Sequence, residues 1–237
     1  MSPSSDGPLC LVTGVGPGTG TALVERFLAD GYRVVMLARD EARLQALADR
    51  HARAHPLACN VADAEALGDA CATVLDRWGA PDVLIHNAVR GARGDFLEIA
   101  PKTLQGCFDV NVMALLNLAQ ALAPAMIERG SGAILATGNT AAYRGKDFFA
   151  GFAPTKAAQR ILLESMARSA GPKGIHVAYV AIDAVIDLEW TRAHWPDEPD
   201  AFFCKPADIA EECFRLAHQP RSAWSFESVI RPFGEPW

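Results

Sequence analysis

Short apolar runs alternate with amphipathic stretches along the whole chain, and this alternation predicts strands and helices in turn. The apolar runs predict strands at 8–13, 33–38, 55–59, 82–87, 132–137, 175–182 and 228–233. The stretches between them predict helices at 19–30, 40–52, 63–78, 101–129, 154–170 and 206–217.

The strands are apolar at successive positions, as in Val34-Val35-Met36-Leu37. Such runs are typical of a parallel sheet covered on both faces. Regular β-α alternation with right-handed crossovers predicts an α/β, doubly wound three-layer Rossmann fold with a seven-stranded parallel sheet. We expect a single domain over 1–237, because the chain shows no repeat, low-complexity tract or linker.

A glycine-rich turn, Thr13–Gly20, lies between the first expected strand and the first expected helix. Glycines allow a tight turn and let a pyrophosphate approach bare N–H groups at a helix N-terminus. The position of this turn between strand and helix favours nucleotide binding over a plain tight turn.

The second strand ends in Leu37-Ala38-Arg39-Asp40, and this tip bears on the choice of cofactor. An acid at the strand tip binds the ribose 2′-hydroxyl of NAD, whereas a small residue beside an arginine accommodates the 2′-phosphate of NADP. Ala38 and Arg39 therefore favour NADP(H). The alternative is that Arg39 is a solvated charge that pairs with Asp40.

Composition narrows the classes of function. Half of the 237 residues are apolar, and the net charge of −6 comes without a basic block, so we expect a globular protein that does not bind nucleic acid. Six scattered cysteines without a CxxC pair indicate reduced thiols and no metal site. The segment Met1–Asp6 lacks signal-peptide features, and no uninterrupted apolar stretch reaches membrane-spanning length, so we expect a soluble, cytoplasmic protein with no membrane partner.

With these motifs, the chain resembles the short-chain dehydrogenase/reductase superfamily over nearly its whole length. Gly14, Gly18 and Gly20 match the TGxxxGxG turn of the family, and His86-Asn87-Ala88-Val89 is similar to its NNAG segment. The resemblance implies a cofactor site that contains Gly14, Gly18, Thr19, Gly20, Arg39, Asn60, Val61, Asn87, Lys156 and Val185. It also implies a variable substrate lid around 187–205 and a homodimer or homotetramer that uses the apolar helix 101–129.

The catalytic segment departs from the family pattern. The family places a tyrosine four residues before a lysine, and this segment reads Phe152-Ala153-Pro154-Thr155-Lys156. Thirteen residues before Phe152, where the family has a serine, the chain has Asn139. Enoyl-reductase relatives use a longer tyrosine–lysine spacing, and Phe149 occupies that position. The lysine is kept while the phenol is lost.

Four residues are candidates to replace the missing acid: Tyr143, His86, Asp183 and Asp187. Local structural roles are favoured for Tyr143 as a loop aromatic, for His86 at a strand end and for Asp187 in a turn. For Asp183 the two interpretations are even. The aromatic residues of the lid, Trp190, Trp195, Phe202 and Phe203, line a substrate pocket or anchor the loop to the core.

These observations predict an atypical NADP(H)-dependent oxidoreductase. The substrate is an uncharged, partly apolar carbonyl, alcohol or activated alkene, which Asn139 orients, while Asn111 supports Lys156 through a water. The alternative is a non-catalytic NADP(H)-binding protein that acts as a sensor or assembly partner. Loss of general acid catalysis costs about 10²–10⁴-fold in rate, so reduction is weakened but not forbidden.

Overall fold

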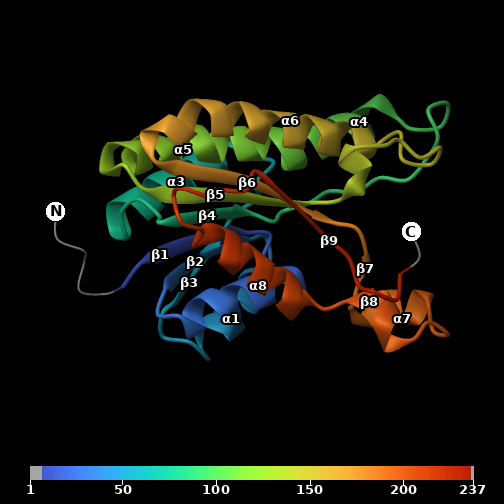
Figure 1. Cartoon of the computed structure of the whole chain (residues 1–237), viewed down its shortest axis with the longest axis horizontal. Helices are drawn as coiled ribbons and strands as arrows, with labels where there is room; N and C mark the ends of the chain where they lie inside the picture. The colour runs from blue at the N-terminus through green and yellow to red at the C-terminus, as the bar shows by residue number, and fades with distance from the viewer. Residues whose placement is uncertain (1–6, 236–237) are drawn as a thin grey trace.

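A seven-stranded parallel sheet forms the centre of the molecule (Figure 1). The computed structural model describes residues 7–235. The strand order is β3-β2-β1-β4-β5-β6-β9, which confirms the predicted fold class. The strands are β1 (Leu9–Thr13), β2 (Arg33–Ala38), β3 (Ala54–Ala58), β4 (Val83–His86), β5 (Gly132–Gly138), β6 (Ile175–Ile182) and β9 (Glu227–Ile230).

Helices cover the sheet on both faces (Figure 1). One face carries α3 (Ala64–Arg77), α4 (Pro101–Phe108), α5 (Ala114–Arg129) and α6 (Ala153–Ala170). The other face carries α1 (Thr19–Ala29), α2 (Glu41–Ala48) and α8 (Pro206–Ala217). In β1, Leu9 and Leu11 pack into the first layer, whereas Cys10 and Val12 pack into the second. Burial on both faces is why this strand is apolar at every position.

The predicted helix over 101–129 is interrupted by a π-helical turn. The turn spans Asp109–Met113, between α4 and α5. By length and composition alone, the helix Pro101–Arg129 is apolar enough to cross a membrane, although polar residues interrupt it. Leu115, Leu118 and Leu122 are fully buried against the sheet, so part of this hydropathy belongs to the protein core.

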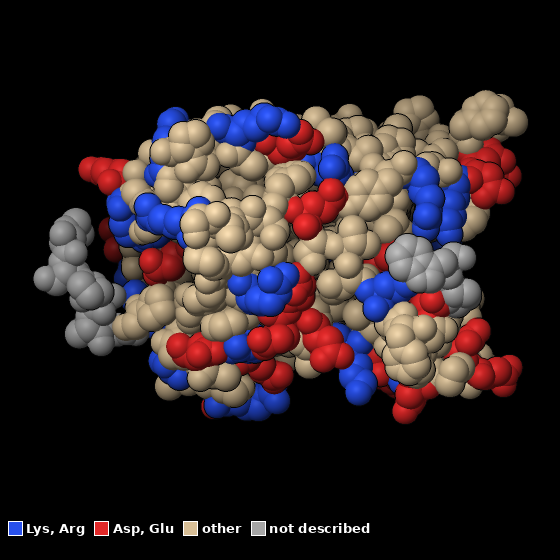
Figure 2. All heavy atoms as spheres, in the orientation of Figure 1, with Lys and Arg blue, Asp and Glu red and all other residues tan. Residues whose placement is uncertain are grey.

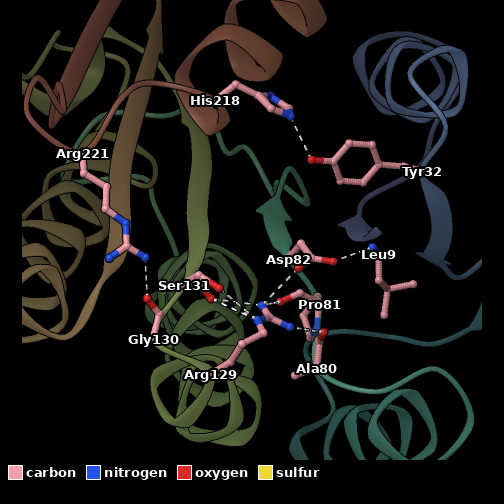
Figure 3. Close-up of polar contacts among 10 residues, drawn as sticks. All are labelled: Leu9, Tyr32, Ala80, Pro81, Asp82, Arg129, Gly130, Ser131, His218 and Arg221. Atoms are coloured by element: carbon pink, nitrogen blue, oxygen red, sulfur yellow. Dashed lines mark hydrogen bonds and ion pairs between the residues drawn. The ribbon is translucent and has the colours of Figure 1, made fainter. Parts of the chain in front are cut away.

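Hydrogen bonds at the amino ends of the strands hold the chain segments that enter the sheet (Figure 3). Arg129 donates to the carbonyl oxygens of Ala80 (2.8 Å) and Pro81 (2.6 Å), and its guanidinium lies 3.5 Å from a carboxylate oxygen of Asp82. The other oxygen of Asp82 accepts the N–H of Leu9 at 2.8 Å. The starts of β1, β4 and β5 are therefore fixed to the end of α5.

The segment 187–205, expected to be a substrate lid, contains short regular elements. They are α7 (Glu189–His194), a 3-10 turn over Asp200–Phe202 and β8 (Phe203–Cys204), and β7 (Val185–Ile186) lies directly before the segment. β7 and β8 pair in parallel as a separate two-stranded sheet. The last expected strand, 228–233, is displaced to Glu227–Ile230, and the helix expected over 40–52 ends at Ala48.

Two expectations from composition can be compared with the structure. All six cysteines are free and buried, as expected for reduced thiols. Lysines and arginines alternate with acidic residues over the face shown in Figure 2, and no broad positive area lies on that face. The segment Met1–Asp6, on which the localisation prediction partly rests, lies outside the described residues.

Candidate active site

The glycine turn after β1 is shaped by close backbone contacts. Gly14 has φ +72°, and a Cβ there would lie 2.5 Å from the Cα and the backbone nitrogen of Ala88. A Cβ at Gly20 would lie 2.4 Å from the carbonyl oxygen of Gly14. The first residue of α1 is Thr19, and its N-cap, Gly18, provides no side-chain hydrogen bond to the helix. The N-terminal N–H groups of α1 are thus left without a side-chain cap, which suits an anionic pyrophosphate.

Asn87, at the end of β4, joins this turn to β5. Its amide donates to the carbonyl oxygen of Gly14 at 2.9 Å and accepts from the hydroxyl of Thr137 at 2.9 Å. Across the turn, the side chain of Leu188 packs on Gly18, where an added Cβ would lie 2.3 Å from its Cδ2. The turn therefore contacts both the sheet edge and the segment that follows β7. Val185, the first residue of β7, is half-buried.

The tip of β2 leaves the predicted NADP residue accessible. Arg39 is exposed. Asp40 caps α2 by accepting the N–H of Arg43 at 3.0 Å, and its carboxylate lies 3.1 Å from the guanidinium of that residue. Asp40 thus pairs with Arg43, and a free guanidinium at Arg39 fits a 2′-phosphate. After β3, Asn60 is exposed and Val61 is buried.

Lys156 lies in the first turn of α6 and is only 2% exposed. Its Nζ donates to Oε1 of Gln159 at 2.9 Å and to the carbonyl oxygen of Thr137 at 3.3 Å. It also lies 5.8 Å from the centre of the Phe152 ring. Burial lowers the pKa of the Lys156 amine to about 7. Such an amine is able to give and take a proton near neutral pH.

Phe152 stands at the N-cap of α6, where the family tyrosine is expected, and it is 9% exposed. Its ring packs edge-to-face on Phe149, with centroids 5.9 Å apart. The structure therefore brings Phe152, Lys156 and Thr137 together beside Asn87, at the carboxyl edge of the sheet.

Asn111 is fully buried within the π-helical turn. Its side chain accepts the N–H of Arg90 at 2.9 Å and donates to the carbonyl of the same residue at 3.0 Å and to the Thr155 hydroxyl at 2.8 Å. The link to Lys156 that the structure shows is Gln159, which the sequence analysis missed. The Nε2 of Gln159 donates to the Asn111 carbonyl oxygen at 2.8 Å, and its Oε1 accepts from Lys156.

Asn139 follows β5 and caps the 3-10 turn Thr140–Ala142. Its Oδ1 accepts the N–H of Ala141 at 3.2 Å, so its Nδ2 is the end that is left to donate. Its backbone is held by Tyr179: the Asn139 N–H donates to the Tyr179 hydroxyl at 3.0 Å, and that hydroxyl donates to the Asn139 carbonyl at 3.1 Å. Tyr179 is fully buried, and burial raises the pKa of its phenol.

The two candidate carboxylates are both held by arginines. Asp183 accepts from Thr140 at 2.6 Å and from Arg231. Burial opposes its ionisation, but these two hydrogen bonds and the positive charges of Arg231 and Arg144 together outweigh burial and lower the pKa of Asp183. Asp187 forms a two-point ion pair with Arg192, at 2.7 and 2.9 Å, which lowers the pKa of Asp187. Both are therefore ionised ion-pair partners near neutral pH, which favours structural roles for them.

The remaining two candidates have structural partners as well. The Tyr143 hydroxyl donates to Glu227, and burial together with this hydrogen bond raises the pKa of the phenol. The His86 Nε2 donates to the carbonyl of Val110 at 3.0 Å, so its Nδ1 accepts from the hydroxyl of Thr13, also at 3.0 Å. Burial and the positive charge of Lys156 lower the pKa of His86 to about 3. His86 is thus neutral and cannot relay a proton at pH 7.

The aromatic residues of segment 187–205 differ in exposure. Trp190 is 66% exposed on α7, Phe203 is buried on β8, and Trp195 and Phe202 are half-buried. The guanidinium of Arg192 lies 4.0 Å above the centre of the Phe203 ring. Phe203 therefore anchors the segment, whereas Trp190 is free to contact a bound molecule. No cluster of histidine, cysteine or acidic residues that suits a metal ion occurs within 7–235.

Known proteins share both the sequence and the fold of this chain. It is 33% identical over 203 residues to a sorbitol dehydrogenase from Cereibacter sphaeroides, and the match covers 84% of this chain and 76% of that protein. It is 30% identical over 240 residues to carbonyl reductase [NADPH] 2 from Sus scrofa, which covers 97% of each chain. The structure of a metagenomic short-chain oxidoreductase in complex with NADP matches with a TM-score of 0.82 and 27% identity, over 95% of this chain and 96% of that one.

The family model that describes short chain dehydrogenases matches residues 9–194. This range includes the glycine turn, Asn87, Asn111 and the Lys156 segment. Together with the relatives above, the match establishes that the chain belongs to the short-chain dehydrogenase/reductase family of oxidoreductases.

Proposed function

We propose that this chain is an NADP(H)-dependent oxidoreductase in which the Lys156 amine supplies the proton that a tyrosine supplies elsewhere in the family. The observation that carries the proposal is the position of this amine. It is buried at the carboxyl edge of the sheet, beside the Phe152 ring, and its pKa is about 7. An acid–base group is most effective when its pKa lies near the working pH.

Several features support the cofactor assignment. Gly14 and Gly20 have no room for a side chain, the N-terminus of α1 has no side-chain cap, and Arg39 is exposed at the tip of β2. A relative of the chain is named for NADPH, and a structural neighbour holds NADP. When bound, the dinucleotide supplies or accepts a hydride, and the protein contributes position and proton transfer.

The proposed substrate is an uncharged, partly apolar carbonyl compound. During reduction of the carbonyl group, the Lys156 ammonium would give one proton to the substrate oxygen, which takes up the electron pair of the C=O π bond. This leaves a neutral amine at Lys156, which regains a proton from solvent. The Nδ2 of Asn139 is the donor we propose to orient the carbonyl, because its Oδ1 is held by Ala141.

The alternative function is non-catalytic binding of NADP(H). It is favoured by one observation: the hydroxyls of Tyr179, Thr155 and Thr137 are all engaged in hydrogen bonds to the protein. The pocket then keeps the cofactor while the chain acts as a sensor or assembly partner.

A turnover assay separates the two functions. We expect wild-type protein to oxidise NADPH with at least one member of a panel of carbonyl compounds and activated alkenes, and Lys156→Met to abolish this turnover. The matched control is Lys173→Met, which removes an exposed lysine and should keep full activity. If wild type binds NADPH but turns over no member of the panel, the binding function is supported and the oxidoreductase proposal fails.

A further inference from the structure

Gln159 connects the two buried polar groups of the site. It lies three residues after Lys156 on α6, so both side chains share one face of the helix. Its side chain is fully buried, and both ends of its amide are used. Oε1 accepts from the Lys156 amine at 2.9 Å, and Nε2 donates to the Asn111 carbonyl at 2.8 Å.

The orientation of this amide is fixed by chemistry. A backbone carbonyl only accepts hydrogen bonds, so the NH₂ end of Gln159 must face Asn111 and the oxygen must face Lys156. Asn111 in turn is held by the backbone of Arg90 and by Thr155. Gln159 therefore presents a fixed acceptor to Lys156.

The electrostatic surroundings of Lys156 make this acceptor important. Within residues 7–235, no carboxylate forms an ion pair with the amine, and the only acceptors shown for it are neutral oxygens of Gln159 and Thr137. The titratable neighbour is His86, which the charge of Lys156 affects. His86 is neutral wherever Lys156 titrates, so it adds no charge there. Two carboxylates beyond this pair, Asp183 after β6 and Glu227 on β9, are paired with Arg231 and Arg160.

We propose that Gln159 is a positioning residue for Lys156: its neutral amide holds the amine against the end of β5 and sets the pH at which the amine exchanges its proton. A carboxylate at this position would hold the ammonium too strongly, and an apolar side chain would leave it with the Thr137 carbonyl alone. The proposal deepens the proposed function, since it concerns the proposed proton donor, but its test needs no catalysis.

The test is an NMR titration of the protein without cofactor. With ¹³C-labelled lysine, the Cε signal of Lys156 is identified by its loss in Lys156→Met, and the exposed Lys102, Lys146, Lys173 and Lys205 give reference signals in the same spectrum. In wild type we expect the Lys156 midpoint at about 7. In Gln159→Met, loss of a hydrogen bond to the charged form should lower that midpoint by about one pH unit.

Gln159→Glu is the second variant, and it keeps the shape of the side chain. We expect it to raise the Lys156 midpoint, because an opposite charge at hydrogen-bond distance favours the ammonium. Gln120→Glu adds the same charge at an exposed position of α5 and should leave the midpoint unchanged. A Lys156 midpoint that stays at the wild-type value in both Gln159 variants would overturn the proposal. Because the titration uses no substrate, it can succeed or fail independently of the turnover assay.

Discussion

Restoring a phenol at position 152 tests the proposed chemistry directly. In Phe152→Tyr a hydroxyl enters a site where the Lys156 amine lies 5.8 Å from the ring centre. A general acid contributes about 10²–10⁴-fold to a rate. Because wild type already has Lys156 as its proposed acid, we expect the variant to reduce its carbonyl substrate faster than wild type under conditions in which Lys156 is charged, with about 10²–10⁴-fold as the upper limit of the gain.

The pH dependence of this gain follows from the same distance. With the distance to the ring centre, about 6 Å, as the scale of separation and an effective dielectric constant of about 20, the ammonium stabilises a forming phenolate by about 3 kcal/mol, or about two pH units in the phenol pKa. Since the pKa of Lys156 is about 7, this help disappears as pH rises through 7. The variant should lose up to about 100-fold in rate and then level off, because an ordinary phenol keeps its proton to about pH 10. Wild type should keep falling, because its only proposed acid is lost.

The assay is the steady-state oxidation of NADPH on both sides of pH 7, with NADPH binding measured in parallel. Phe149→Tyr is the matched control: its ring packs on Phe152, and no contact with Lys156 is shown for it. Equal rates for Phe152→Tyr and wild type at every pH, with NADPH binding intact, would refute the reasoning. So would an equal gain from Phe149→Tyr.

Two further predictions concern charge. Arg39→Asp should weaken NADPH binding by at least about tenfold and leave NADH binding unchanged, since one charge-assisted contact is worth about 1.5–3 kcal/mol. An unchanged ratio of NADPH to NADH affinity in fluorescence titrations would contradict the cofactor assignment. Asp183 has a lowered pKa, so its contribution to the free energy of unfolding is present above its unfolded-state pKa and is lost as pH falls through its folded-state pKa. Asp183→Asn should therefore be less stable than wild type at neutral pH and should lose less stability on acidification, as measured by urea unfolding. If the free energies of unfolding of the two proteins fall in parallel as pH is lowered, that result would count against the ion pair with Arg231.

The fold was predictable because its signals are local and repeated. Runs such as Val34–Leu37 are apolar on both faces, and only a sheet covered on both sides buries them. Gly14 and Gly20 were also predictable, because their spacing between a strand and a helix is itself a local signal. In the structure each approaches backbone atoms that leave no room for a Cβ. The short elements β7, β8 and α7 were not predicted, since strands of two residues have no period to detect.

The partners within the site were harder to predict, because they depend on tertiary contacts. The hydrogen bond between His86 and Thr13 joins residues 73 positions apart in the sequence. Likewise, the arginine that pairs with Asp183 is Arg231, which directly follows β9 and lies 48 positions away in the sequence. Gln159 was within reach of sequence reasoning: a polar residue three positions after a catalytic-type lysine shares its helical face. Its contact with Lys156 was not predicted, because the family pattern assigns no role to that position.

The ionisable groups around the site differ in whether their charge changes near neutral pH. His86 stays neutral, with a pKa of about 3, and Asp183 and Asp187 stay ionised beside their arginines. The phenols of Tyr143 and Tyr179 keep their protons, because burial raises both pKa values. A group that both gives and takes a proton in one catalytic cycle is most effective when its pKa lies near the working pH, so that both forms are populated.

Among these groups, only Lys156, with a pKa of about 7, meets that requirement. Any carbonyl reduction by this chain should therefore decline with the loss of the Lys156 proton, whatever the substrate. An activity that instead declines through a pKa near 3 or above 9 would assign the proton to a different group. Comparison of the pH–rate profile with the NMR midpoint of Lys156 makes the distinction, because the two must move together in the Gln159 variants.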